Sequence, residues 1–136
     1  MCGVVVDMDS FDFKKLYDVG EHLKDYSKEE EYQRSSISRY YYSAYHPTKD
    51  YYEKYFRKTL SSKDSHSALI KALENSPFHE ENILGEKLRT LRNNRNHAEY
   101  RRKRIKKNKT KESKIKTDEI FKLIKFLINH PVRIAN

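Results

Sequence analysis

The chain has 136 residues and a formal net charge of +9, and 36% of its residues are hydrophobic while another 36% are charged. This length fits a single domain over residues 1–136, and only three Gly and three Pro argue against a turn-rich β fold. No segment approaches the roughly 18 apolar residues of a membrane span, and Cys2, the only cysteine, excludes a disulfide framework. Residues 1–9 are expected to form a tail that is not a signal peptide, so we expect a cytoplasmic protein.

Two helices are predicted in the first third of the chain. The first covers residues 11–26, with Ser10 as its N-cap and an apolar stripe along one side. The second follows Ser27, has an acidic first turn and runs to about His46.

Pro47 is expected to bend or break this second helix, which resumes over residues 50–56. The region is rich in aromatic side chains that either form a core and a dimer face, the favoured interpretation, or stack on RNA bases. These side chains are Tyr41, Tyr42, Tyr45, Tyr51, Tyr52 and Tyr55.

Three further segments complete the predicted fold. A polar linker over 60–65 leads to a short helix over 66–74, and a longer helix runs from about 80 to 96 or beyond. The last helix, 118–130, has Thr117 as its cap and the clearest amphipathic stripe in the chain. The sequence therefore predicts an all-α, up-and-down bundle of four to five helices.

Residues 101–116 contain ten basic side chains and one Glu, which accounts for the whole net charge. We expect a solvated, mobile loop before the last helix, whose cations hold an RNA backbone by counterion release. The candidate nucleic-acid-binding residues are Arg95, Arg101, Arg102, Lys103, Arg104, Lys106 and Lys107.

Residues 88–100 read LRTLRNNRNHAEY and supply the candidate chemistry. His97 can exchange a proton near neutral pH, and Arg92 carries a permanent planar cation that matches a phosphate. With Asn93 and Asn96 to orient the scissile group, the set suits metal-independent cleavage of an RNA phosphodiester. The alternative is a polar helix end with a solvated Arg and a capping His.

Arg92 and His97 are five residues apart, which separates them by about 140° around a straight helix. Two arrangements could bring them together. Either the helix breaks inside the asparagine run, or two copies pool their motifs across a two-fold axis.

Three blocks resemble the HEPN superfamily of small all-α domains, many of which are RNases or toxins. The stretch from Arg92 to His97 resembles the Arg-x4-His signature, residues 38–46 (SRYYYSAYH) resemble the aromatic second helix, and residues 66–70 (HSALI) resemble the third. The resemblance covers roughly residues 10–130 and implies a homodimer with both motifs lining one cleft. It also implies a toxin–antitoxin role, with an antitoxin or nucleotidyltransferase partner.

Two registers of this resemblance remain open. In HEPN toxins paired with a nucleotidyltransferase a Tyr falls two residues after the His, whereas Tyr100 falls three after His97. Residues 95–100 (RNHAEY) also resemble the Arg-x-x-Ala-Asp-Tyr ending of HEPN relatives without assigned catalysis, in which case Arg95 is the motif arginine.

The favoured function is therefore a metal-independent endoribonuclease that needs no cofactor and leaves a 2′,3′-cyclic phosphate. His97 is the general acid/base and Arg92 the phosphate clamp, and Tyr100 assists or is a modification target. The alternatives are a non-catalytic module that binds nucleotide, RNA or a protein, and a helical dimerisation unit.

Overall fold

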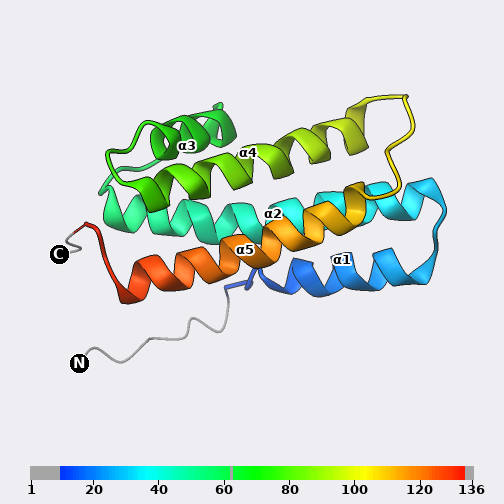
Figure 1. Ribbon diagram of the computed structural model, residues 1–136, viewed down its shortest axis with the longest axis horizontal. Coiled ribbons are helices and arrows are strands. Elements are labelled where there is room, and N and C mark those ends of the chain that lie inside the picture. The colour runs from blue at the N-terminus through cyan, green and yellow to red at the C-terminus, as the bar shows by residue number, and fades with distance from the viewer. Residues whose placement is uncertain (1–9, 62, 134–136) are drawn as a thin grey trace.

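The computed structural model describes residues 10–61 and 63–133, and all the regular structure in that part of the chain is helical. Its elements are α1 (Lys15–Tyr26), α2 (Glu30–Tyr55), α3 (Ser65–Glu74), α4 (His79–Tyr100) and α5 (Lys109–Asn129). The predicted all-α, up-and-down bundle is confirmed (Figure 1). The expected tail over 1–9, with Cys2, lies outside the described residues. None of these helices is long and apolar enough to cross a membrane.

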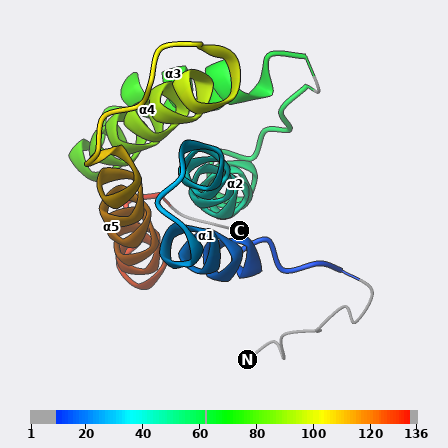
Figure 2. The same ribbon diagram turned by 90° about the vertical axis from the view of Figure 1, so that its right-hand side faces the viewer.

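Helix α2 is the centre of the bundle. It contacts each of the other four helices, and Figure 2 shows α1, α4 and α5 arranged around it. The shared core is built from side chains at helical spacing, which places them on one face of each helix. Its fully buried members include Ile37, Tyr41, Leu69, Leu73, Leu84, Leu88, Leu91, Ile120 and Leu127.

Much of this core is tyrosine, as the sequence predicts. Tyr41, Tyr45, Tyr51, Tyr52 and Tyr55 are all buried, and Tyr42 is half-buried. Buried phenols need hydrogen-bond partners, and several of these hydroxyls find them in polar side chains of neighbouring helices. The hydroxyl of Tyr51 donates to a carboxylate oxygen of the fully buried Glu81 at 2.6 Å, and that of Tyr45 lies 2.9 Å from the Ser65 hydroxyl. Rings packed in this way cannot stack on RNA bases.

Of the two effects predicted for Pro47, a bend or a break, the break is wrong, because α2 continues to Tyr55. Proline inside a helix removes one backbone hydrogen bond and costs about 3 kcal/mol. Continuing the helix buries Tyr51, Tyr52 and Tyr55 against the core, and burial of each large side chain is worth roughly 1.5–3 kcal/mol. The packing therefore outweighs the proline.

The predicted start of the last helix at residue 118 is also wrong. Helix α5 begins at Lys109, so only residues 101–108 connect it to α4. Thr117 is not a cap but a fully buried residue inside the helix, and its hydroxyl donates to the Ser113 carbonyl oxygen at 2.8 Å. Thr110, Ser113 and Thr117 extend the buried face of α5 by small polar side chains, which an apolar pattern does not reveal.

Helix α1 begins at Lys15 rather than at residue 11. The Asp12 side chain accepts a hydrogen bond from the Lys14 backbone N–H at 3.0 Å, and the Phe13 ring stacks on His46 with centroids 3.6 Å apart. These contacts keep the segment before α1 in a turn.

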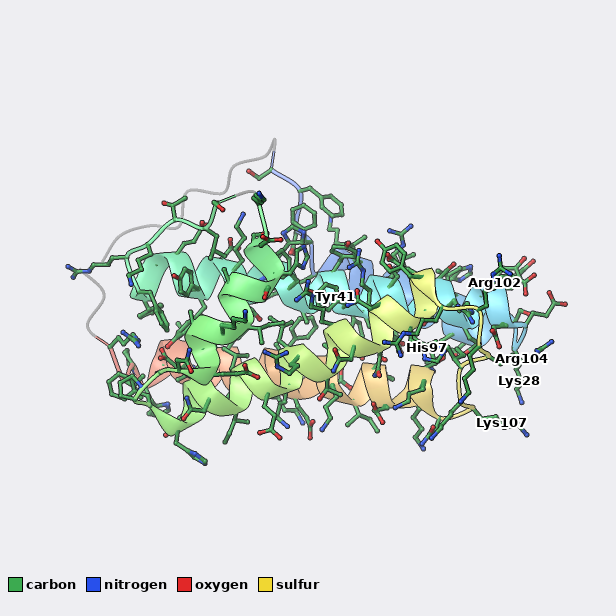
Figure 3. All side chains as sticks on the ribbon, turned by 90° about the horizontal axis from the view of Figure 1, so that it is seen from above. Lys28, Tyr41, His97, Arg102, Arg104 and Lys107 are labelled. Atoms are coloured by element: carbon green, nitrogen blue, oxygen red, sulfur yellow. The ribbon has the colours of Figure 1, made fainter. Side chains whose placement is uncertain are left out.

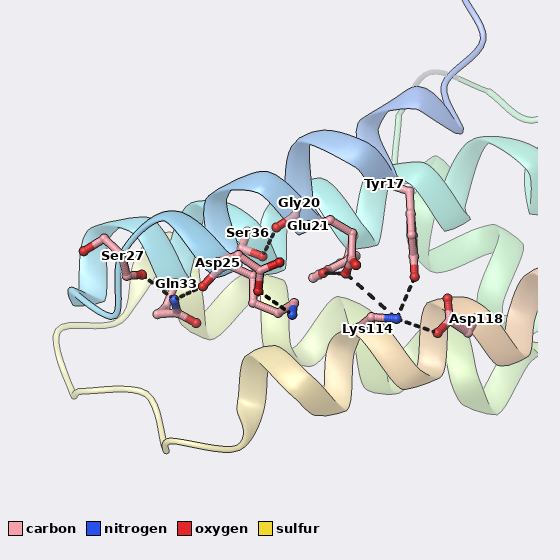
Figure 4. Close-up of polar contacts among 11 residues, drawn as sticks. Tyr17, Gly20, Glu21, Asp25, Ser27, Gln33, Ser36, Lys114 and Asp118 are labelled. Carbon is pink, nitrogen blue, oxygen red and sulfur yellow. Dashed lines mark hydrogen bonds and ion pairs between the residues drawn. The ribbon is translucent and has the colours of Figure 1, made fainter.

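Polar contacts then fix α1 against its neighbours (Figure 4). Lys114 of α5 donates to the Tyr17 hydroxyl at 2.9 Å and pairs with Asp118 at 3.1 Å. Ser36 of α2 donates to the Gly20 carbonyl oxygen at 2.7 Å, at a position where a Cβ would lie 3.2 Å from the Tyr40 ring. The turn between α1 and α2 lies at the same end of the bundle as residues 101–108, which connect α4 to α5 (Figure 1).

Candidate nucleic-acid interface

The connection between α4 and α5, residues 101–108, is tied to α2 mainly by one side chain. Arg34 of α2 ion-pairs with Glu30 at 2.8 Å and directs the rest of its guanidinium at backbone carbonyl oxygens 2.7–3.2 Å away. These carbonyls belong to His97, Ala98, Arg101 and Lys103. The end of α4 has unpaired carbonyls and a partial negative charge, so the half-buried cation of Arg34 both caps the helix and contacts the loop.

The loop presents its basic side chains to solvent. All six are exposed, and 88% of the Arg104 side chain is accessible. Within the described part of the chain, the one ion pair among them is a long one, 3.9 Å from Arg104 to Glu30. The side chains without an ion pair are those of Arg101, Arg102, Lys103, Lys106 and Lys107.

The basic residues that follow in α5 differ in this respect. Lys109 pairs with Glu112 at 3.4 Å, Lys114 with Asp118 at 3.1 Å, and Lys116 with Glu119 at 3.7 Å. The run 101–116 therefore consists of two structurally different parts. Residues 101–108 form a loop whose basic side chains are exposed and mostly without ion pairs, and residues 109–116 are helical, with most of their basic side chains in ion pairs.

A groove of about 900 Å³ opens between the loop and the α1–α2 turn. Lys28, Arg104 and Lys107 line this groove, and Figure 3 shows them, with Arg102, at one end of the molecule. Glu29, Glu30 and Glu31 form one edge of the groove. Its basic lining residues are Lys24, Lys28, Arg104, Lys106, Lys107 and Lys111. We call the loop 101–108 together with this groove the basic end.

His97 lines a second, smaller hollow of about 360 Å³. Its other lining residues are Asn93, Asn94, Arg101, Ile105 and Lys109. The Nε2 atom of His97 lies 2.8 Å from the Lys103 carbonyl oxygen. Because a carbonyl only accepts, Nε2 carries the proton, and Nδ1 of the neutral ring is left as the acceptor.

Helix α4 is continuous through the asparagine run to Tyr100, so the predicted alternative of a break there is wrong. Arg92 does not share a site with His97 within one chain. Burial raises the pKa of Tyr41 and lowers that of His66, and the charge of Arg92 acts on both groups, which places Arg92 toward α2 and α3. Its Nε atom is buried without a hydrogen-bond partner in the described structure.

The three asparagines of this segment also lie in different surroundings. Asn94 is buried and donates to the carboxylate of Glu112 at 3.0 Å and to the Ser113 hydroxyl at 3.2 Å, so it joins α4 to α5. Asn93 is exposed in the hollow beside His97. Asn96 accepts a hydrogen bond from Arg95 at 3.1 Å and is absent from the lining of that hollow.

Arg95 is engaged within the molecule. It donates to the Tyr42 hydroxyl at 2.6 Å, pairs with Glu99 at 3.0 Å, and lies over the rings of Tyr42 and Tyr100 with 5.2 and 5.5 Å to their centroids. Only 14% of its side chain is accessible. These contacts favour a structural role for Arg95 over a direct contact with nucleic acid.

The other histidines near α4 are packed among aromatic rings. His66 is hydrogen-bonded through Nδ1 to the Tyr41 hydroxyl and stacks on Tyr45 at 3.9 Å between centroids. Burial, followed by the nearby charges of Arg95 and Arg92, lowers the pKa of His66 to about 4. It is therefore neutral at pH 7 and poorly suited to proton transfer there.

Sequence reasoning missed Arg34, Lys24 and Lys28. The carbonyls that Arg34 contacts are 63 to 69 residues away along the chain, and no local pattern marks such a contact. No group of three or more His, Cys, Asp or Glu side chains that could hold a metal ion occurs within residues 10–61 and 63–133. No protein-family model, curated protein or solved structure matches the chain, so the HEPN resemblance stays a prediction.

Proposed function

We propose that this protein binds RNA through the basic end. The observation that carries the proposal is the set of five loop cations that have no ion pair in the described structure, on a loop whose Arg101 and Lys103 carbonyl oxygens accept hydrogen bonds from Arg34. Each unneutralised cation that meets a phosphate releases a counterion from the nucleic acid, which is the main source of affinity for a polyanion. A loop that is already ordered loses less entropy when it binds.

The test is fluorescence anisotropy with a labelled RNA of about 12 nucleotides and with DNA of the same sequence. Lys106→Gln/Lys107→Gln removes two loop charges, and Lys122→Gln/Lys125→Gln removes two exposed charges from the distant half of α5. We expect the loop variant to bind RNA about 10-fold more weakly or worse at low salt, and the control variant to bind almost as the wild type does. Equal losses in both variants, or tighter binding to DNA than to RNA, would contradict the proposal.

A second candidate function is metal-independent cleavage of the bound RNA, and the hollow at His97 favours it. There His97, whose Nδ1 is the acceptor, lines a concave surface together with Asn93 and the basic residues Arg101 and Lys109. In cleavage, Nδ1 takes the proton of the 2′-hydroxyl, and the 2′-oxygen attacks phosphorus. The 5′-oxygen then leaves and takes up a proton, which gives a 2′,3′-cyclic phosphate and a 5′-hydroxyl.

This candidate assigns new partners to His97. Within one chain the cation beside the imidazole is Arg101 or Lys109, and Arg92 joins the site only if a second copy supplies it across a two-fold axis. The homodimer, and with it a toxin role opposed by an antitoxin, rests on the HEPN resemblance.

Incubation with RNA in EDTA separates the two candidates. If the protein cleaves RNA, His97→Gln abolishes the cyclic-phosphate product while the affinity for RNA stays within about two-fold, because the loop cations are unchanged. Arg92→Gln then tests the two-fold arrangement, because it lowers cleavage only if Arg92 reaches the site. Cleavage at the same rate by wild type and His97→Gln would exclude His97, and intact bound RNA would leave binding as the function.

A further inference from the structure

The eleven tyrosines divide sharply by exposure. Nine are buried or half-buried, and only Tyr26 and Tyr100 are exposed, with 64% and 71% of their surface accessible. Tyr26 is the last residue of α1 and Tyr100 the last of α4. Both helices end at the basic end (Figure 1), so both exposed rings belong to residues at that end of the molecule.

We propose that the basic end takes single-stranded RNA, with Tyr26 and Tyr100 stacking on unpaired bases. The inference rests on the proposed RNA binding and adds the class of RNA. An aromatic ring beside a cationic backbone track is the arrangement that binds single strands, because every unpaired base has a free face. A duplex offers these rings no face except at its ends, since its bases are stacked on one another.

Each ring is supported from within the molecule. Tyr26 lies against Tyr32, with 5.1 Å between ring centroids, and against His22 at 5.9 Å. The Arg95 guanidinium lies 5.5 Å from the centroid of Tyr100, whose hydroxyl is 3.5 Å from Arg95 Nη2. A supported ring has fewer conformations to lose on binding than a free one, so the stacking energy is better retained.

The positions of the two rings match the cations along the chain. Tyr100 directly precedes Arg101, the first cation of the loop, and Tyr26 lies between Lys24 and Lys28, which line the groove. The groove is lined both by Lys24 and Lys28, which flank Tyr26 in the sequence, and by Arg104 of the loop that follows Tyr100. A strand that binds these cations therefore lies at the end of the molecule that carries both exposed rings.

The experiment compares a single-stranded RNA of about 12 nucleotides with the blunt duplex that it forms with its complement. Tyr26→Ala and Tyr100→Ala should each weaken binding to the single strand by about 5- to 100-fold and leave binding to the duplex unchanged. Tyr26→Phe and Tyr100→Phe, which keep the ring, should bind within about two-fold of the wild type. The control is Phe126→Ala, an aromatic ring that is 46% exposed near the far end of α5.

The outcomes separate this inference from the proposed function. Wild-type protein that binds RNA, together with alanine variants that bind the single strand equally well, would overturn the stacking and leave RNA binding in place. Tighter binding to the duplex than to the single strand would overturn it as well. Wild-type protein that binds neither RNA would overturn the proposed function itself.

Discussion

His66 shows how one residue can be mistaken for an active-site group. A histidine near two arginines and a tyrosine has the composition of a catalytic site, yet its surroundings keep it neutral. It is hydrogen-bonded to Tyr41 and stacked on Tyr45, and burial lowers its pKa to about 4. The same burial makes His66 a source of pH-dependent stability.

The sign of that dependence follows from the two protonation states. The unfolded chain protonates His66 near its ordinary pKa of 6.5, whereas the folded protein resists protonation down to about pH 4. The contribution of His66 is therefore complete above pH 6.5 and is lost as the pH falls toward 4. Burial also lowers the pKa of His46, which adds a loss of the same sign.

We predict that wild-type protein loses about 1–2 kcal/mol more of its free energy of unfolding than His66→Gln between pH 7 and pH 4.5. Urea unfolding at the two pH values measures the difference, and comparison of the two proteins removes the common titration of the carboxylates. Identical pH dependence in both would mean that His66 is protonated as readily in the folded protein as in the unfolded chain.

At the scale of single residues, the sequence predicts the separation of Arg92 and His97 but not their partners. The helical repeat alone sets the angle between them. His97 is oriented by the Lys103 carbonyl oxygen in the loop, and Arg95 lies over the ring of Tyr42, which is distant in sequence. For this reason the sequence could not decide between Arg92 and Arg95, whereas the packing around Arg95 favours a structural role for that residue.

Elements were predictable where packing and local pattern agree. Helices α3 and α4 lie close to their predicted ranges because their apolar side chains repeat at helical spacing. Pro47 misleads because tertiary packing overrides its local preference. The start of α5 was missed because Thr110, Ser113 and Thr117 fill the buried face where apolar residues were expected.

The loop between α4 and α5 depends on an element that precedes it by many residues. Arg34 of α2 donates to carbonyls at the end of α4 and in the loop, and a lysine cannot reproduce this set of bonds because it lacks the planar fork. We therefore expect the order of the loop to depend on the hydrogen bonds that Arg34 donates.

Limited trypsin digestion tests this, since the loop contains six basic residues at which trypsin can cut. We predict that Arg34→Ala raises the rate of cleavage within residues 101–107 by about 10-fold, because hydrogen bonds to a charged group are worth about 1.5 kcal/mol or more. Arg34→Lys should lie between Arg34→Ala and the wild type. Arg39→Ala, an exposed site on the same helix, serves as the control and should digest as the wild type does. Equal rates in all four proteins would show that the loop is held by something else.

Across the whole molecule, the charge is concentrated rather than spread. The net charge of +9 equals that of residues 101–116, and the unneutralised part of that run lies at one end of the elongated bundle (Figure 1). Ion pairs along α5 neutralise much of the remainder. Such an asymmetric distribution attracts a polyanion to one end and orients it before contact.

The dependence of RNA affinity on salt tests the central claim most directly. A single strand loses affinity with a logarithmic slope of about −0.7 for each phosphate that the protein neutralises. If the loop cations contact phosphates, Lys106→Gln/Lys107→Gln should make the slope shallower by about 1.4, and Lys122→Gln/Lys125→Gln should leave it at the wild-type value. One common slope for the three proteins would contradict binding through the loop.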